Sequence, residues 1–413
     1  MKNKNIICLL FILIFYCGSN AQNKSSLQSK QYIESGNAKS DLKDYHGAIQ
    51  DYNKAIELDP KDALAYNNRG LAKSDLKDYH GAIQDFNKVI ELDPKYALAY
   101  TIRGVAKSEL KDYHGAIQDY NKAIELNPKF AFAYTVRGIA KKDLKDYHGA
   151  IQDYNKTIEL NPKISLAYYN RGIAKSDLKD YHGAIQDYNK AIELNPKKTF
   201  TYKNRGNAKS DLKDYHGAIQ DFNKAIELDP KYALAYFDRG FAKFRLEDYH
   251  GAIQDFNKVI ELDPKKADAY YNRGNAKSIL EDYHGAIQDF NKAIELDPKY
   301  AKAYFNRGVT KSILQDYHGA IQDFNKVIEL DPKKADAYYN RGLAKSNLKD
   351  YQGAIQDYNK VIELDPKYAD DVYTIRGLAK NILKDKKGAC LDWSKAGELG
   401  NKKAFDLIKK YCN

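Results

Sequence analysis

The sequence predicts an all-α protein, a solenoid of stacked antiparallel helix pairs with about eleven repeats and a C-terminal capping helix. The ten prolines run from Pro60 to Pro366 at a constant spacing of 34 residues. The stretch Asp44–Pro60 returns almost unchanged along most of the chain. A constant period of this length is typical of one supersecondary unit stacked many times, because each unit buries its apolar faces only against its neighbours.

The second helix of each repeat is predicted within Asp44–Pro60. Its apolar residues have the spacing that forms one face of an α-helix: Ala48, Ile49, Tyr52, Ala55 and Ile56. Asp44 is the expected N-cap, because its carboxylate accepts hydrogen bonds from the free amides of the first turn. Asp59 is the expected end, because a residue before proline avoids the helical conformation.

The first helix of each repeat is predicted over Ala63–Leu76. We number the repeat positions 1 to 34 from the start of this helix, so that Gly70 is position 8 and Phe86 is position 24. The chain turns back near positions 15 and 16, so facing positions on the two antiparallel helices sum to about 31. Gly70 therefore faces Phe86 and leaves room for its ring. By the same sum, Arg69 faces Asp85, and a repeated Arg–Asp pair is predicted.

The solenoid is expected over residues 29–403. The last repeat starts one residue late and departs from the others, with Trp393 at position 24 and Asn401 in place of proline. Residues 404–413 are expected to form the capping helix, since a terminal repeat exposes one face to water. The expected repeat starts are Ser29, Ala63, Ala97, Ala131, Ser165, Thr199, Ala233, Ala267, Ala301, Ala335 and Asp370.

These positions resemble the tetratricopeptide repeat (TPR), which has an aromatic residue at 4, Gly at 8, Ala at 20, an aromatic residue at 24, a small residue at 27 and Pro at 32. The chain departs from that pattern at position 7, which is Arg from Arg69 to Arg341, and at position 11, which is Lys from Lys73 to Lys345. The resemblance implies a right-handed superhelical solenoid. Its concave groove would be lined by positions 2, 5, 9, 12 and 13 and would bind a protein or an extended peptide.

Residues 1–21 are predicted to be a signal peptide. Lys2 and Lys4 precede the apolar run Ile6–Cys17, and small residues lead to a cleavage site after Ala21. The run is short for a membrane span, so no transmembrane segment is expected in the mature chain. Lipidation of Cys17 is the alternative. Residues 22–28 would be a short linker, and the protein would be exported to the periplasm, associated with the outer membrane, or secreted.

The charge pattern does not favour nucleic-acid binding. The positions of the histidines do not favour metal binding or catalysis. Without residues 1–21 the chain has 65 basic and 56 acidic residues, but each repeat mixes the two signs, so no nucleic-acid partner is expected. An anionic polymer or a membrane surface remains an alternative partner. The nine histidines, from His46 to His318, share one position about 10 Å apart in neighbouring repeats, too far to share a metal ion. The Asp and Glu positions are expected on helix surfaces, and the glycines at positions 8 and 19 at helix contacts. We therefore expect no enzyme, no metal and no cofactor.

The candidate partner site is in repeats six to nine, where the copied pattern changes. In repeat seven three rings fall at positions 5, 9 and 12, on one face of the first helix. A C-terminal carboxylate clamp of the TPR type is matched only by Lys203 and Asn207, since Asp238, Asp268 and Asn272 do not fit it. The alternatives are neutral drift at exposed positions and a structural envelope or surface protein whose repeats set length. The candidate residues are Lys203, Asn207, Phe237, Phe241, Phe244, Arg245, Tyr271, Asn275 and Phe305.

Cys390 and Cys412 are the only cysteines after residue 21. Asn401, midway between them, lies in the turn between the last two predicted helices, and antiparallel helices would bring the two thiols to the same height. In an oxidising compartment a disulfide between them is predicted. The alternative is a pair of small buried apolar side chains.

Overall fold

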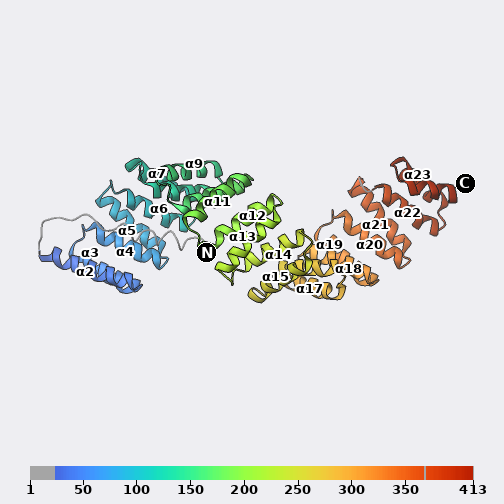
Figure 1. Ribbon diagram of the computed structural model, residues 1–413, viewed down its shortest axis with the longest axis horizontal. Helices are drawn as coiled ribbons and strands as arrows, with labels where there is room; N and C mark the ends of the chain where they lie inside the picture. The colour runs from blue at the N-terminus through green and yellow to red at the C-terminus, as the bar shows by residue number, and fades with distance from the viewer. Residues whose placement is uncertain (1–23, 367–368, 413) are drawn as a thin grey trace. The chain divides into compact units, whose positions relative to one another are not determined.

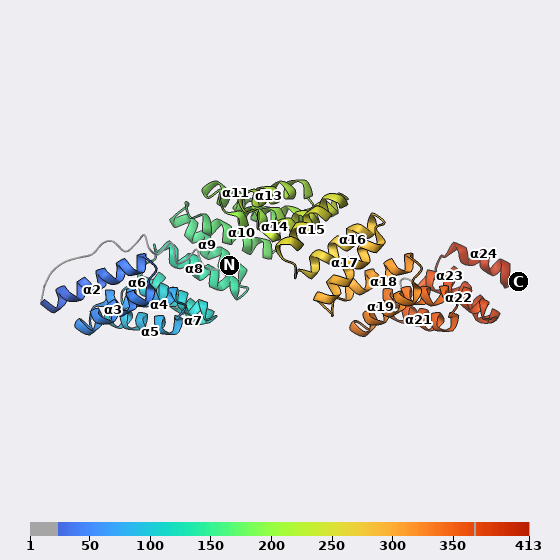
Figure 2. The same cartoon turned by 90° about the horizontal axis from the view of Figure 1, so that it is seen from below.

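The computed structural model describes residues 24–366 and 369–412, and in this part of the chain all regular secondary structure is helical. The described residues form two compact halves, which divide between Ala208 and Lys209, within α12. In each half the helices stack in chain order, and each packs mainly on the helices adjacent to it in the sequence (Figures 1 and 2). Some first helices also touch the first helix of the next repeat, as α6 touches α8 and α14 touches α16.

The helix bounds follow the predicted repeat closely. α4 ends one residue early, with Leu76 as its C-cap. α2 begins inside the expected linker 22–28, and α24 begins two residues before the expected capping helix. The helices are α2 Lys24–Asp41, α3 Tyr45–Leu58, α4 Ala63–Asp75, α5 Tyr79–Leu92, α6 Ala97–Glu109, α7 Tyr113–Leu126, α8 Ala131–Asp143, α9 Tyr147–Leu160, α10 Ser165–Asp177, α11 Tyr181–Leu194, α12 Thr199–Asp211, α13 Tyr215–Leu228, α14 Ala233–Arg245, α15 Tyr249–Leu262, α16 Ala267–Ile279, α17 Tyr283–Leu296, α18 Ala301–Ile313, α19 Tyr317–Leu330, α20 Ala335–Asn347, α21 Tyr351–Leu364, α22 Ala369–Ile382, α23 Lys386–Glu398 and α24 Lys402–Tyr411.

The second helix of each repeat begins at an aspartate cap, as predicted. Asp44 accepts a hydrogen bond from the amide of Gly47 at 3.0 Å, and the same bond recurs in every later repeat. A Cβ atom at Gly47 would lie 2.1 Å from the capping carboxylate. The glycine at position 19 therefore makes room for the cap, and its assignment to a helix contact was wrong.

The turn between the two helices of a repeat contains a left-handed residue at position 15. Lys77 has a φ of 64°, and its amide donates to the carbonyl of Ser74 at 2.9 Å. The following amide, that of Asp78, donates to the carbonyl of Lys73 at 2.8 Å. These bonds satisfy the free carbonyls at the end of the first helix. In such turns the left-handed residue is commonly glycine. The sequence gives no signal for this conformation, because Lys, Glu or Gln occupies the position.

The core repeats the predicted contact between positions 8 and 24. A Cβ atom at Gly70 would lie 3.0 Å from the ring of Phe86, which is fully buried, so the helices approach each other there as expected. In the last repeat Gly377 faces Trp393 in the same way. Ala at position 20 is also fully buried, as at Ala82. These close contacts position the first helix of each repeat on its second helix.

The predicted Arg–Asp pair is present and forms a buried network. The guanidinium of Arg69 donates to both oxygens of Asp85, with Nε at 3.0 Å, and its Nη1 donates to Asn53 of the preceding repeat at 2.7 Å. Lys73 adds an ion pair to Asp85 at 2.8 Å. Asp85 is only 3% exposed, so position 23 is a core position, and its assignment to a helix surface was wrong. The two cations offset the free-energy cost of removing this carboxylate from water.

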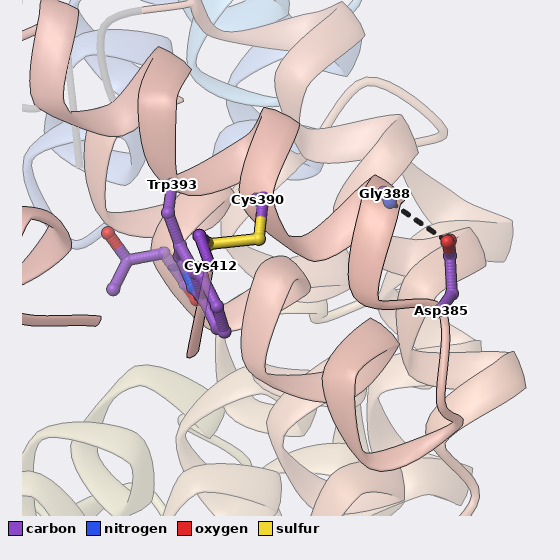
Figure 3. Close-up of a disulfide and its surroundings, with 6 residues drawn as sticks. Asp385, Gly388, Cys390, Trp393 and Cys412 are labelled. Carbon is purple, nitrogen blue, oxygen red and sulfur yellow. Dashed lines mark hydrogen bonds between the residues drawn. A yellow bond between two sulfur atoms is a disulfide. The ribbon is translucent and has the colours of Figure 1, made fainter. Parts of the chain in front are cut away.

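The C-terminal end is closed by α24, which packs on α23. Cys390 and Cys412 are joined by a disulfide with a Cα–Cα distance of 5.8 Å (Figure 3). Both cysteines lie against the core cluster of Ala389, Trp393, Ala396 and Ala404. The side chain of Asn401 caps α24 by accepting from the amide of Lys403 at 3.1 Å. The disulfide therefore links the capping helix to the last repeat.

Candidate functional site

The predicted partner-site residues fall in both halves of the chain. Lys203 and Asn207 are partly buried on α12, in the N-terminal half. The others are on α14, α16 and α18 in the C-terminal half, where α14 touches α16 and α16 touches α18. The site is described below within the C-terminal half.

Two of the three rings of repeat seven pack on the second helix of their own repeat. The ring centroid of Phe237 lies 5.8 Å from that of Phe256, and the ring of Phe244 meets that of Tyr249 edge-on at 5.2 Å. Phe241 remains 43% exposed. Of these three rings, Phe241 is thus the exposed one, whereas Phe237 and Phe244 pack on α15.

The cations near these rings lie over aromatic faces. Arg245, which is exposed, has its guanidinium 5.7 Å from the ring centroid of Tyr215. The ammonium of Lys266 lies 5.8 Å from the ring centroid of Phe237. Such contacts orient long basic side chains against the helix surface and leave their charged ends in water.

In repeat eight, Tyr271 and Asn275 are held by a hydrogen-bond network. Asn306 of the next repeat donates to the hydroxyl of Tyr271 at 3.2 Å and to the side-chain oxygen of Asn275 at 2.7 Å. The ring of Tyr300 lies 5.0 Å from that of Tyr271, and its hydroxyl donates to Asp268 at 2.8 Å. Burial and the Asp268 carboxylate raise the pKa of Tyr300. Tyr271 is therefore covered by its neighbours and fixed in place.

In repeats nine to eleven, Phe305 lines a hollow of about 450 Å³. Its other polar and aromatic lining residues are Asp336, Tyr339, Asn340 and Asp371, from positions 2, 5 and 6. Burial, and then the charge of Asp371, raise the pKa of Tyr339. Positions 2 and 5, two of the five that the TPR resemblance assigns to the groove, thus line this hollow, and positions 9, 12 and 13 do not.

Sequence reasoning did not assign to the site three exposed aliphatic side chains of the first helices in repeats seven to nine. Leu234 at position 2 is 47% exposed, and Ile279 and Ile313 at position 13 are 49% and 51% exposed. Positions 2, 9 and 13 lie on one side of a helix, so these residues and Phe241 belong to one side of the first helices of repeats seven to nine. We call these four residues the apolar stripe. The available signal was position 13, which is acidic in repeats one to six and isoleucine in repeats eight and nine.

The structure bears on the expectations about a metal site and about a membrane-spanning segment. Among residues 24–366 and 369–412, no three His, Cys, Asp or Glu side chains are grouped so that they could hold a metal ion. The histidines lie one residue into the second helices and are exposed, as at His80. Within the same described ranges, no helix is both long and apolar enough to cross a membrane.

Models of known protein families match the chain along the same repeats. Models described as "Tetratricopeptide repeat" match residues 63–96, 97–130, 133–164, 165–198, 267–300, 290–322 and 335–368. A model described as "TPR repeat" matches residues 36–77, 206–247, 242–278 and 313–349. Together these matches cover most of the chain, and several begin at a predicted repeat start. The chain belongs to the tetratricopeptide repeat family, and its stacked helix pairs form a scaffold of a kind suited to protein binding.

The chain is also similar to solved structures of TPR proteins. The C-terminal part of a TPR repeat-containing protein from Cytophaga hutchinsonii is 22% identical, covers 58% of this chain and 98% of its own, and has a TM-score of 0.52. That similarity concerns the fold alone. A TPR protein from Parabacteroides merdae is 21% identical, with 60% and 99% coverage and a TM-score of 0.48. YrrB, described as a TPR protein with an unusual peptide-binding site, is 26% identical, with 45% and 95% coverage and a TM-score of 0.40. No curated protein matches the chain.

Proposed function

We propose that this protein is an exported scaffold that binds a protein or peptide partner along the first helices of its C-terminal half and has no catalytic activity. The observation that carries the proposal is the apolar stripe. Four large apolar side chains of neighbouring repeats are each between 43% and 51% exposed. Large apolar side chains gathered on one exposed face are typical of a surface that a partner covers.

Two further features support this partner class. The stripe has a basic neighbour in Arg245, so a partner that buries apolar side chains there also meets positive charge at the edge, whereas nearby Lys266 is paired with Asp268 at 3.4 Å. The hollow beside Phe305 and Tyr339 lies on the same side of the first helices as the stripe. It provides a pocket for an anchoring side chain. A segment lying along several repeats would contact both.

The absence of catalysis is proposed because the repeated charged groups already have structural partners. Each Asp at position 23 from Asp85 onwards has a lysine at 2.8 or 2.9 Å, from position 11 of its own repeat. General acid–base catalysis needs a group that is free to take and give a proton in a cleft. The histidines are exposed on a helix surface and do not form one.

The binding proposal is tested with the pair Phe241→Asn and Ile279→Asn. Asparagine already occupies these positions at Asn275 and Asn347, so the helices tolerate it. The partner is captured from the cell envelope, identified and purified, and its affinity is then measured by titration. We expect the paired change to weaken binding by about a hundredfold, as for loss of two buried apolar anchors, with an unchanged melting temperature.

The control is Leu42→Asn, which removes a side chain that is 82% exposed in the first repeat. We expect it to leave affinity unchanged. Equal affinity of the wild type and the paired variant would refute the stripe as a binding surface. A stable protein that captures no partner from its own envelope would favour a structural role in which the repeats set length.

Export rests on residues 1–21, which lie outside the described residues. The basic start, apolar run and small residues there are typical of a cleaved signal. N-terminal sequencing of the protein isolated from its own cells is expected to start at Gln22. A lipid-modified Cys17 at the start would instead identify a lipoprotein, and an intact Met1 would contradict export by cleavage.

A further inference from the structure

The positive charge of the chain is concentrated at its C-terminal end. Residues 384–412 contain eight lysines and four acidic residues. An interior repeat such as Ala63–Tyr96 contains five basic and five acidic residues. The end of the solenoid thus has an excess of lysine that the repeat itself does not require.

Three of the four acidic residues of this segment are already engaged, and the fourth, Asp406, is exposed on α24. Asp392 is buried and bound by Arg376 and Lys380, and Asp385 caps α23 by accepting from Gly388 at 2.8 Å. Glu398 pairs with Lys395 at 2.7 Å. By contrast, seven exposed lysines of this segment have no carboxylate within ion-pairing distance in the described part of the chain: Lys384, Lys386, Lys387, Lys402, Lys403, Lys409 and Lys410.

Three of these lysines are placed where they oppose the helix dipole. Lys386 and Lys387 open α23, at the positive end of that helix, where the other repeats have Tyr followed by His or Gln. Lys402 opens α24 in the same way. A cation in the first turn destabilises a helix by a few tenths of a kcal/mol or more, so the fold gives no reason for these lysines.

The same lysines surround exposed apolar side chains. A hollow of about 480 Å³ is lined by Lys386, Lys387, Cys390, Leu391, Ser394 and Cys412, so the disulfide and Leu391 provide apolar surface beside two lysines. Leu391 is 64% exposed. The hollow therefore combines positive charge with exposed apolar surface.

The exposed side of α24 continues this surface. Lys402, Phe405, Lys409 and Cys412 are spaced three, four and three residues apart, which places them on one side of the helix. Because Cys412 lines the hollow, this side borders it. Phe405 is 58% exposed, and its ring lies near Gly397 of α23, on the side of that helix that also carries Cys390 and Ser394. Lysines and large apolar side chains therefore lie together on one face of α23 and α24, which we call the terminal face, and Asp406 of α24 is an exposed carboxylate among them.

We propose that the terminal face docks on the surface of an anionic lipid bilayer. Unpaired lysines are attracted to anionic headgroups, and exposed Leu391 and Phe405 enter the boundary between headgroups and acyl chains. A polyanion offers the charge but no apolar phase for these two side chains, so the observations favour a bilayer. The docking is peripheral and leaves the apolar stripe of the earlier repeats free, and it does not depend on the function proposed for that stripe.

The test is co-sedimentation of the chain starting at Gln22 with vesicles of phosphatidylcholine alone, and with vesicles in which phosphatidylglycerol makes up about a third of the lipid. We expect binding to the anionic vesicles only, weakened when the salt is raised from about 0.1 to about 0.5 M. Each lysine at an anionic surface contributes about fivefold, so Lys386→Gln, Lys387→Gln, Lys402→Gln and Lys409→Gln together should weaken binding several hundredfold.

The matched control changes four interior turn lysines to glutamine, at Lys77, Lys111, Lys145 and Lys179. They are exposed, glutamine already occupies this position at Gln315, and the change in net charge is the same. We expect this control to lose little binding. Equal losses in the two quadruple variants would overturn the terminal face as the docking site, as would a wild-type protein that does not bind anionic vesicles at low salt.

A second pair of changes, Leu391→Ala and Phe405→Ala, tests the bilayer itself. Both side chains are mostly exposed, and circular dichroism checks that the fold is kept. We expect about a tenfold loss of vesicle binding. If this pair binds vesicles like the wild type, or if soluble polyphosphate or an acidic polypeptide binds the terminal face as tightly as the vesicles do, the face recognises anions in general and the bilayer assignment is overturned.

Discussion

At the scale of single residues, the buried tyrosines at position 24 differ in whether their hydroxyl group has a hydrogen-bond partner, and the residue at position 12 decides this. The hydroxyl of Tyr120 lies 3.1 Å from that of Ser108, and the hydroxyl of Tyr358 lies 3.1 Å from that of Ser346. Burial raises the pKa of Tyr358 to about 12. In repeat four the serine is replaced by Lys142, whose ammonium pairs with Asp143 at 2.6 Å. The hydroxyl of Tyr154 is therefore buried without a hydrogen-bond partner in the described structure.

This difference predicts opposite effects for the same substitution. Tyr154→Phe removes an unsatisfied buried hydroxyl and should raise the free energy of unfolding by about 1 kcal/mol. Tyr120→Phe removes a satisfied one, strands Ser108 and should lower it by about 1 kcal/mol. Phenylalanine already fits this position at Phe86, which is fully buried. Urea unfolding of the two variants measures both effects, and a loss of stability in Tyr154→Phe would contradict the assignment.

At the scale of the elements, the Arg, Asp and Lys network joins neighbouring repeats. Arg307 donates to Asp323 of its own repeat and, at 2.6 Å, to Asn291 of the preceding one. Lys311 completes the network with an ion pair of 2.9 Å. The guanidinium also lies 5.4 Å from the ring centroid of Tyr304. The network therefore fixes both helices of one repeat and the second helix of the repeat before it.

We predict that breaking this network is far more costly than breaking a surface pair. Arg307→Ala leaves Asp323, whose side chain is 3% exposed, with only Lys311 and should lower the free energy of unfolding by about 3 kcal/mol or more. The control is Lys326→Ala, which removes an ion pair to Glu329, a side chain that is 65% exposed, and should cost at most about 0.5 kcal/mol. Urea titration compares the two. Equal costs would show that the buried network adds little.

At the scale of the whole molecule, the stability of each helix depends mainly on the helices next to it in the sequence. Each helix packs mainly on the helices adjacent in sequence, so a terminal helix has contacts on one side only. In such an array the ends open first. α24 offsets this weakness with the Asn401 cap, the packing of Ala404 and the disulfide to α23.

The disulfide is expected to stabilise the cap measurably. It closes a loop with a sequence separation of 22 residues, which in the chain-entropy account contributes about 3 kcal/mol. Cys390→Ala with Cys412→Ala should therefore accelerate hydrogen exchange of the α24 amides, with little change in the earlier repeats. Two free thiols in protein isolated without reductant would contradict the bond. Unchanged exchange in the double variant would contradict its stabilising role.

The sequence by itself determined the repeat. The 34-residue period, the proline after each second helix, the aspartate cap and the glycine opposite an aromatic ring are local signals, and each is copied many times. The facing of Arg69 and Asp85 followed from the same register. These features depend on one helix pair, whose geometry is set by spacing along the chain.

Only the tertiary structure decided which of these groups are covered. The burial of Asp85 depends on Lys73 and on an arginine that also binds Asn53, so it involves helices of two repeats. Phe237 and Phe241 lie on the same helix, but the first rests on Phe256 and the second remains 43% exposed. Spacing along one helix assigns a residue to a side of that helix. Its exposure depends on how closely the neighbouring helices approach, which the packing of all the surrounding side chains decides.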